Sequence, residues 1–288
     1  MCPAQLTLLS RGLGAAFALA LATTAHAQVL MLDFGPTSPT GASTTNSPYH
    51  TAAGSSFTDG TWNVVGTADV TSGLLFSNNT AATGVSVNLG KSTTTTIALD
   101  SQPATSSALG SPTNTGVYSG TSVGTDGIFS GSNTSNNSIG LQIGGLAAGT
   151  YDIYVTARNT NTGSDATGNS QTVYLGSSST SGNFDFGSYG SNASTLTYPT
   201  KSSATLYTAS WVEGENYVKL SVTLSAGEFL NLAVDGTALG SGGDTRGFLN
   251  SVQIVSTGAS PIPEPSTYAA LAGAVVLGLV VLRRRRTP

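Results

Sequence analysis

The chain has 288 residues, of which 8% are charged and 36 are glycine, and its formal net charge is −4 at pH 7. Between Gln28 and Ile262 it holds 13 Asp and Glu against 5 Lys and Arg, a net charge of −8, and a surface of that sign does not attract nucleic acid. The single cysteine, Cys2, excludes an intramolecular disulfide and a cysteine metal site.

The first 27 residues have the layout of a secretory signal peptide. Arg11 is the only charge ahead of the apolar run at 12–22, and Ala25 and Ala27 are the small residues that signal peptidase reads. We therefore expect cleavage by signal peptidase between Ala27 and Gln28. Because only one basic residue precedes the apolar run, an uncleaved anchor is the alternative.

Residues 28–257 predict one exported β domain. Short apolar or alternating segments are separated by stretches rich in Gly, Ser, Thr and Asn, and no long amphipathic helical pattern occurs. The strands are expected at 29–34, 62–65, 74–76, 84–89, 93–99, 139–143, 150–158, 171–175, 206–211, 217–224, 228–234 and 248–255. A dozen short strands without helices predict an all-β fold, which we interpret as a single β-sandwich.

Three pairings follow from the pattern of these segments. The first and last, 29–34 and 248–255, are apolar enough to be central, and we expect them side by side and antiparallel in one sheet. The short turn at 225–227 predicts a hairpin between 217–224 and 228–234. Segment 171–175 is expected to pair with 150–158, whose Tyr151, Ile153 and Val155 should face inward.

Segment 146–154, LAAGTYDIY, resembles a phrase of jelly-roll modules of the galactose-binding and carbohydrate-binding type. The opening LDFG at 32–35 and the closing FLNSVQI at 248–254 are also similar to the ends of such modules. The resemblance implies a jelly-roll-like sandwich over 28–257 and a module that could bind a glycan.

No catalytic motif is present in the exported region. His50, its only histidine, lies in a Ser/Pro/Tyr segment, no serine has the surroundings of a nucleophile elbow, and we expect a solvated loop residue. Glu213 and Glu215 flank Gly214 and are expected to be solvated turn carboxylates rather than a glycosidase pair. We therefore predict no catalytic residue and no enzymatic activity.

Two pairs of residues are weaker binding candidates. Asp235 and Asp244 flank a glycine-rich loop, where carboxylates and carbonyls could hold a structural calcium, although an ordinary polar loop is the preferred interpretation and no cofactor is expected. Trp62 and Trp211 could stack on sugar rings, although core packing is the usual role of an aromatic residue in a sandwich strand.

The C-terminus combines a proline-rich stalk at 258–266, a segment without charge or proline at 267–282, and a basic tail at 283–288. The apolar segment of 16 residues predicts a transmembrane helix of about 24 Å, short of a hydrocarbon core of about 30 Å. A cluster of positive charges on one side acts as a stop-transfer signal and places the tail in the cytoplasm. That cluster consists of Arg283, Arg284, Arg285 and Arg286.

The order of Pro263-Glu264-Pro265, apolar helix and arginine cluster resembles the PEP-CTERM sorting signal of Gram-negative bacteria that make exopolysaccharide. The resemblance implies an exosortase, a membrane protease that recognises the tripeptide and removes the helix. A plain single-span anchor with a proline-rich stalk is the alternative.

These features predict a protein exported across the inner membrane, anchored transiently by its C-terminal helix, and then held in the envelope, at the surface or in the matrix. A non-enzymatic structural role in the envelope or exopolysaccharide layer is the first hypothesis. A module that binds extracellular polysaccharide is the alternative, and a secreted glycan hydrolase is a weaker one. An exposed aromatic platform would favour glycan binding, and buried aromatic residues would favour the structural role.

Overall fold

The computed structural model describes residues 28–36, 38–106, 115–118, 122–131, 137–160, 169–197, 207–238 and 244–258, and Gly273. The predicted signal peptide, residues 259–266 of the stalk and the basic tail lie outside this set, as does the predicted membrane helix apart from Gly273. Within the set, no helix is both long enough and apolar enough to cross a membrane.

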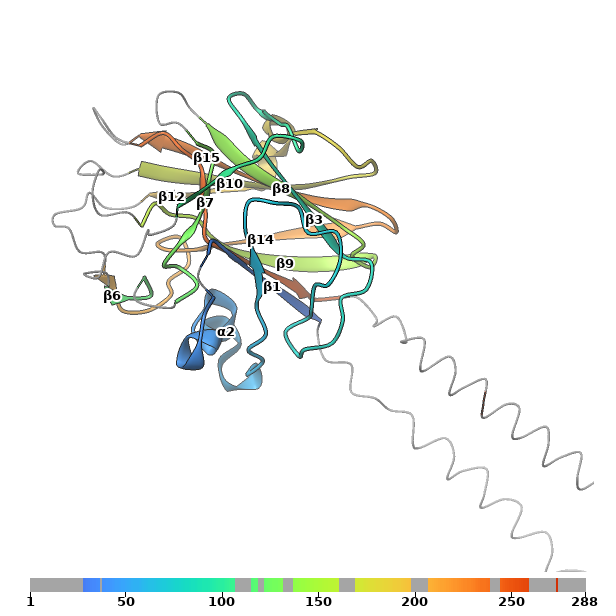
Figure 1. Ribbon diagram of the computed structural model, residues 1–288, viewed down its shortest axis with the longest axis vertical. Helices are drawn as coiled ribbons and strands as arrows, with labels where there is room; N and C mark the ends of the chain where they lie inside the picture. Colours follow the sequence, from blue (N-terminus) through green and yellow to red (C-terminus); the bar gives the residue numbers. More distant parts are fainter. Residues whose placement is uncertain are drawn as a thin grey trace, which may run out of the picture.

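Two five-stranded sheets form the two layers of the fold, which confirms the all-β prediction (Figure 1). The first sheet has the order β14 (Val218–Leu224), β9 (Gly149–Thr156), β17 (Ser251–Ser256), β1 (Val29–Phe34) and β2 (Asn63–Val65). The second has the order β12 (Ala193–Thr197), β10 (Asn169–Ser178), β15 (Phe229–Ala238), β8 (Ser138–Gly144) and β3 (Ser86–Ser92).

Small elements surround these sheets. They are the pair β11 (Phe184–Asp185) and β4 (Thr96–Ile97), the pair β13 (Tyr207–Thr208) and β6 (Thr115–Gly116), and a sheet of β16 (Phe248–Leu249), β7 (Gly127–Phe129) and β5 (Ala104–Ser106). The helical segments are η2 (Gly41–Thr45), α2 (Pro48–Ala53), η3 (Gly54–Ser56) and η4 (Phe186–Asn192). These helical segments are short, the longest being the seven residues of η4, so they do not change the all-β class.

One hydrophobic core lies between the two large sheets. Alternation along the strands places Leu30 and Ile153 of the first sheet in the same buried cluster as Leu141, Val173 and Leu232 of the second. The prediction that Tyr151, Ile153 and Val155 face inward is confirmed, since all three belong to this cluster. Burial of this apolar surface is the main stabilising contribution to the domain.

The outer face of the first sheet is also covered. Val29, Met31, Tyr154 and Val255 point away from the central core, yet each is at most 6% exposed. They pack in a second cluster with Val117, Tyr118, Val123, Trp211 and Tyr217, against which Tyr49, Phe57 and Trp62 lie. This cover explains why β1 is buried at all six positions and why residues 29–32 are all apolar.

The pairing of the first and last strands is confirmed. β1 lies antiparallel to β17, with Val29 opposite Val255 and Asp33 opposite Ser251. The predicted last strand is nevertheless broken at Asn250, because its first two residues leave the sheet and pair with β7 as β16.

Two other predicted pairings were wrong. β14 and β15 belong to different sheets, so the turn at 225–227 crosses from one layer to the other rather than closing a hairpin. β10 pairs with β12 and β15 in the second sheet, whereas β9 lies in the first. A short turn can serve a hairpin or a crossover, and the spacing of apolar residues does not distinguish the two.

Candidate functional site

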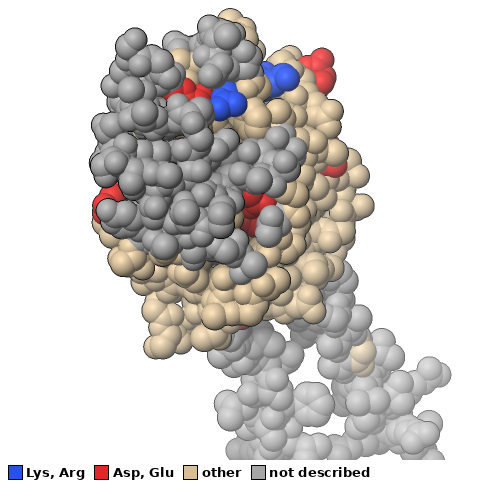
Figure 2. Space-filling model, turned by 60° about the vertical axis from the view of Figure 1, so that its left-hand side comes forward, with Lys and Arg blue, Asp and Glu red and all other residues tan. Residues whose placement is uncertain are grey.

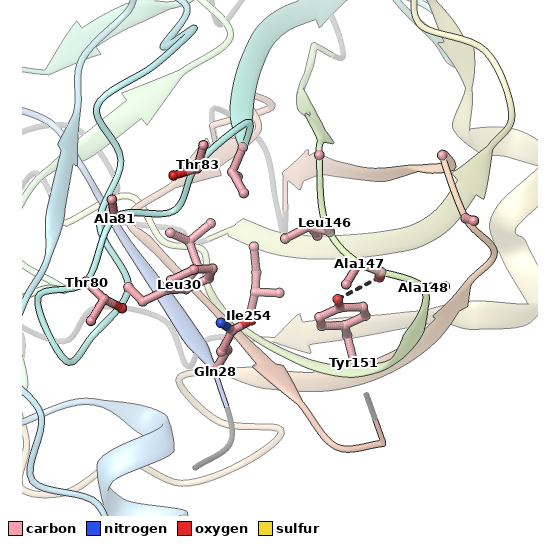
Figure 3. A pocket seen from close by; sticks show the side chains of 15 residues that line it. Gln28, Leu30, Thr80, Ala81, Thr83, Leu146, Ala147, Ala148, Tyr151 and Ile254 are labelled. Atoms are coloured by element: carbon pink, nitrogen blue, oxygen red, sulfur yellow. Dashed lines mark hydrogen bonds between the residues drawn. The ribbon is translucent and has the colours of Figure 1, made fainter. Parts of the chain in front are cut away.

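A pocket of about 690 Å³ opens at one end of the two sheets (Figure 3). The start of β1 and three turns surround it: the turn within 76–85, the turn between β8 and β9, and the turn between β14 and β15. Leu30, Leu146 and Ile254 point into it in the close-up view. These side chains also belong to the central core, so the pocket is the place where that core opens to the surface.

The turn that forms one wall of the pocket has a fixed shape. Gly145 has φ of +78°, and a Cβ there would lie 2.0 Å from the carbonyl oxygen of Gly84. The hydroxyl of Tyr151 donates a hydrogen bond of 2.7 Å to the carbonyl oxygen of Ala147, and burial raises the pKa of this phenol. The wall is therefore held by a close backbone approach and by a buried tyrosine.

The described lining of the pocket is mostly apolar, with a few uncharged polar groups. Its polar side chains are Gln28, Thr80, Thr83 and Tyr151, and no Asp, Glu, His, Lys or Arg is among the described residues that line it. An apolar floor with a few hydroxyl and amide groups can hold an uncharged molecule. Among the described lining residues, Tyr151 is the one whose side chain is of a type used in general acid–base catalysis, and its hydroxyl donates to the carbonyl oxygen of Ala147.

Both ends of the domain meet beside this pocket. The backbone N–H of Ser256 donates to the carbonyl oxygen of Gln28 at 3.0 Å, and that of Thr257 donates to Thr150 at 2.9 Å. The described part of the last strand segment, which ends at Gly258, therefore ends on the pocket side of the sheets.

The opposite end of the same strands is polar and closed. Buried Asn250 accepts a hydrogen bond from the backbone N–H of Arg158 at 2.6 Å and donates to the carbonyl oxygen of Asp126 at 2.7 Å. Its backbone carbonyl accepts from Phe34, and its N–H donates to Thr156. Asn250 thus joins its own segment to three others, those of Phe34, Asp126 and Thr156–Arg158. These bonds explain why the last strand is interrupted at this residue.

Asp235 and Asp244 lie toward this polar end and take different partners. The Asp244 carboxylate accepts hydrogen bonds from Asn159 at 2.8 Å and from the Arg246 side chain. The Asp235 carboxylate accepts from the Ser138 hydroxyl at 2.8 Å, although burial still raises its pKa. Over the described ranges, no group of three or more His, Cys, Asp and Glu side chains could hold a metal ion.

The two tryptophans lie in or against the cover of the first sheet. Trp211 is 4% exposed, and its indole N–H donates to the Oδ1 atom of Asn46 at 3.0 Å. Trp62 is half-buried and donates to the carbonyl oxygen of Thr44 at 2.9 Å. Each ring packs with the second cluster, so the structure places both residues in packing roles.

His50 is not the solvated loop residue that the sequence predicted. It lies on α2 and is 6% exposed, with Nδ1 2.6 Å from the Ser47 hydroxyl and Nε2 2.8 Å from the carbonyl oxygen of Asp59. Burial lowers the pKa of this imidazole. Ser47 is itself buried and caps α2, so this Ser-His pair fixes the start of the helix.

Glu213 and Glu215 are exposed in the turn before β14, as expected. The charged side chains visible in Figure 2 are few and scattered among other residues of that face. This distribution agrees with the low charge content of the sequence.

Comparison with known proteins identifies the tail. Residues 261–286 match a protein-family profile described as the PEP-CTERM protein-sorting motif. The chain carries a PEP-CTERM sorting signal. Such a motif directs export and membrane anchoring and implies processing by exosortase, a membrane protease. The match confirms the resemblance of the tail to a PEP-CTERM sorting signal. No curated protein and no solved structure gives a significant match to the chain.

Two features of the described region were missed from the sequence. The pocket depends on how three turns come together, and no local pattern marks it. Buried Asp33 did leave a signal, because it interrupts the apolar run of a strand that is covered on both faces. A carboxylate in such a position needs an explanation, since burying an isolated charge is costly.

Proposed function

We propose that this is an exported, non-enzymatic jelly-roll protein, sorted through its PEP-CTERM tail to a structural role in the cell envelope or exopolysaccharide layer. The observation that carries the proposal is the sorting motif at 261–286, joined to a β domain whose start and end lie at one pole. The N-terminal signal peptide belongs to the same proposal.

The order of the strands supports the jelly-roll part. Along the chain, the strands of the first sheet are β1, β9, β14 and β17. Strands of the second sheet come between them: β8 after β1, then β10 and β12 after β9, and β15 after β14. Two four-stranded sets result, in the orders β14-β9-β17-β1 and β12-β10-β15-β8. Two sheets connected in this way have the arrangement of a double Greek key.

Burial of the aromatic residues supports a structural role over glycan binding. Trp211, Tyr118 and Tyr154 are at most 6% exposed, and they pack on the outer face of the first sheet. In the described residues, the exposed large hydrophobic side chains are Val64 and Val212, and neither is aromatic. A flat aromatic platform for sugar rings is therefore not supported there.

Changing the charges of the tail tests the sorting part in the native host. Replacing Arg283, Arg284, Arg285 and Arg286 by neutral residues should weaken membrane retention or scramble orientation, because the charges orient a short, weakly apolar helix. The domain should stay folded. A chain that ends at Gly258 is the comparison and should be released.

Fractionation with protease accessibility measures both effects. Equal retention and orientation of the neutral variant would show that the arginines do not orient the tail. Equal retention of the chain that ends at Gly258 would contradict sorting through the tail.

The pocket supports glycan binding as a second candidate, since Gln28, Thr80 and Thr83 offer groups that hydrogen-bond to hydroxyls. Replacing exposed Ala81, which lines it, by Trp should then abolish binding of host polysaccharide. Ala52→Trp, on α2 and also exposed, is the matched control and should bind normally. Equal binding by the two variants would reject the pocket as a glycan site.

A further inference from the structure

Asp33 is the most unusual polar residue of the described region. It is 1% exposed, and neither of its carboxylate oxygens has a hydrogen-bond partner within that region. Because Leu32 and Phe34 point into the central core, Asp33 points to the opposite face of the first sheet. That face is covered by the second cluster, which leaves the carboxylate enclosed.

A second unpartnered oxygen lies in the same row of the sheet. Asp33 is directly opposite Ser251, and Ser251 is directly opposite Thr156 on the next strand. Residues opposite one another in antiparallel strands point to the same face. Thr156 is 0% exposed, and its hydroxyl also has no hydrogen-bond partner among the described residues.

Asp126 brings another carboxylate to this row from outside the sheet. A Cβ placed on Gly35 would lie 2.6 Å from Oδ2 of Asp126, so this carboxylate lies against the backbone two residues from Asp33. Burial, and next the charge of Asp126, raise the pKa of Asp33 to about 9. The two acids are thus close enough to repel each other when both are ionised.

We propose that the carboxylates of Asp33 and Asp126 and the hydroxyl of Thr156 bind a hard divalent cation of the calcium class. Such ions take carboxylate, hydroxyl and carbonyl oxygens as ligands. Neighbouring strands are about 4.8 Å apart, so a cation above Ser251 is within side-chain reach from both sides. Its charge would compensate two acids that share a buried space.

The positive charge nearest to this row along β9 is that of Arg158. Arg158 follows Thr156 by two residues, and its guanidinium carbon lies 5.3 Å from the ring centre of Tyr118. The site also differs from Asp235 and Asp244, whose carboxylates accept hydrogen bonds from Ser138 and from Asn159 and Arg246. By contrast, the Asp33 carboxylate and the Thr156 hydroxyl have no hydrogen-bond partner among the residues that the structure describes.

Calorimetric titration of the full chain, solubilised in detergent and freed of metal with a chelator, tests the proposal. Calcium chloride should give a saturable binding heat and raise the melting temperature, with magnesium chloride as the parallel probe. A chain that shows neither effect with either ion would overturn the proposal. The buried acids would then hold a proton or a water molecule instead.

Variants locate the site. Asp33→Asn preserves shape and should abolish the calcium response. Thr156→Val should weaken calcium affinity by about tenfold, and Thr156→Ser should restore it. Asp235→Asn is the matched control, because it removes a partly buried carboxylate without touching the proposed ligands, and its response should equal that of the parent.

A normal calcium response in folded Asp33→Asn, or its loss in Asp235→Asn, would overturn the assignment. If circular dichroism shows that Asp33→Asn does not fold, the calcium affinities of Thr156→Val and Thr156→Ser test the proposal instead. Equal affinities of those two chains would then contradict the proposal.

Discussion

The two ends of the same strands differ sharply in character. At one end β1, β9 and β17 carry Leu30, Tyr151 and Ile254 into an open, mostly apolar pocket. At the other end β1 and β9 carry Asp33 and Thr156 into a closed polar cluster. The end that is open lies beside the start of the tail, and the closed end lies away from it.

The difference shows that one strand can satisfy two unlike environments over six residues. β1 is buried at every position, so its apolar residues need only be covered, whereas Asp33 needs a specific partner. We therefore expect the polar end to be sensitive to single substitutions and to pH, and the pocket end to tolerate change.

The largest effect is expected from the ionisation of Asp33 when divalent cations are removed. Below pH 3.8 the carboxyl is protonated in both the folded and the unfolded chain, and stability is highest with respect to this group. As the pH rises, the unfolded chain releases the proton while the folded chain keeps it until about pH 9. The free energy of unfolding should therefore fall steadily between these two values.

Urea unfolding in chelator at several pH values measures this trend. Asp33→Asn cannot ionise, so its unfolding free energy should change less with pH than that of the parent. Parallel pH profiles of the two chains would show that Asp33 does not have a raised pKa.

The next effect concerns Asn250 at the polar end. Asn250→Ala removes the partners of the Arg158 N–H and of the Asp126 carbonyl, both in buried surroundings. Loss of stability should be about 2–3 kcal/mol, because a buried group without its partner pays its full desolvation penalty. Thermal or urea unfolding gives the value.

Asn192→Ala is the matched control, since its side chain also bridges two strands, through the carbonyls of Leu175 and Ser221, but is only half-buried. This substitution should lower the free energy of unfolding by about 1 kcal/mol. An equal or larger cost for Asn192→Ala would contradict the special role of the polar end.

The smallest effect is expected at the pocket. Tyr151→Phe removes the hydrogen bond to Ala147 but keeps the ring in the core. The free energy of unfolding should therefore fall by only about 0.5–1 kcal/mol. The same unfolding experiment applies. A loss comparable to that of Asn250→Ala would mean that the two ends do not differ in the way proposed.

Local patterns predicted much of this fold. Alternation located β8, β9 and β14 to within a residue or two, and the continuous apolar run of β1 correctly indicated a central strand beside β17. The tail was recognisable because its tripeptide, apolar segment and arginines are adjacent in sequence. None of these features depends on contacts between distant residues.

The remaining features depend on such contacts. The cover over the first sheet brings Trp211 to Asn46, which is 165 residues away. The six-residue α2 is too short for a helical period, although Ser47 followed by Pro48 is a start signal that the sequence contains. The approach of Asp126 to Gly35, two residues after Asp33, likewise follows from the fold and not from spacing.

The proposed function requires that the β domain is exported and then freed from a tail that serves as a sorting signal. Intact-mass measurement of the protein from its native host tests both processing steps at once. We predict a chain that starts at Gln28 and ends near Pro263–Pro265, and an uncleaved tail when this tripeptide is replaced by three alanines. A mature protein that retains residues 271–286 would contradict the claim.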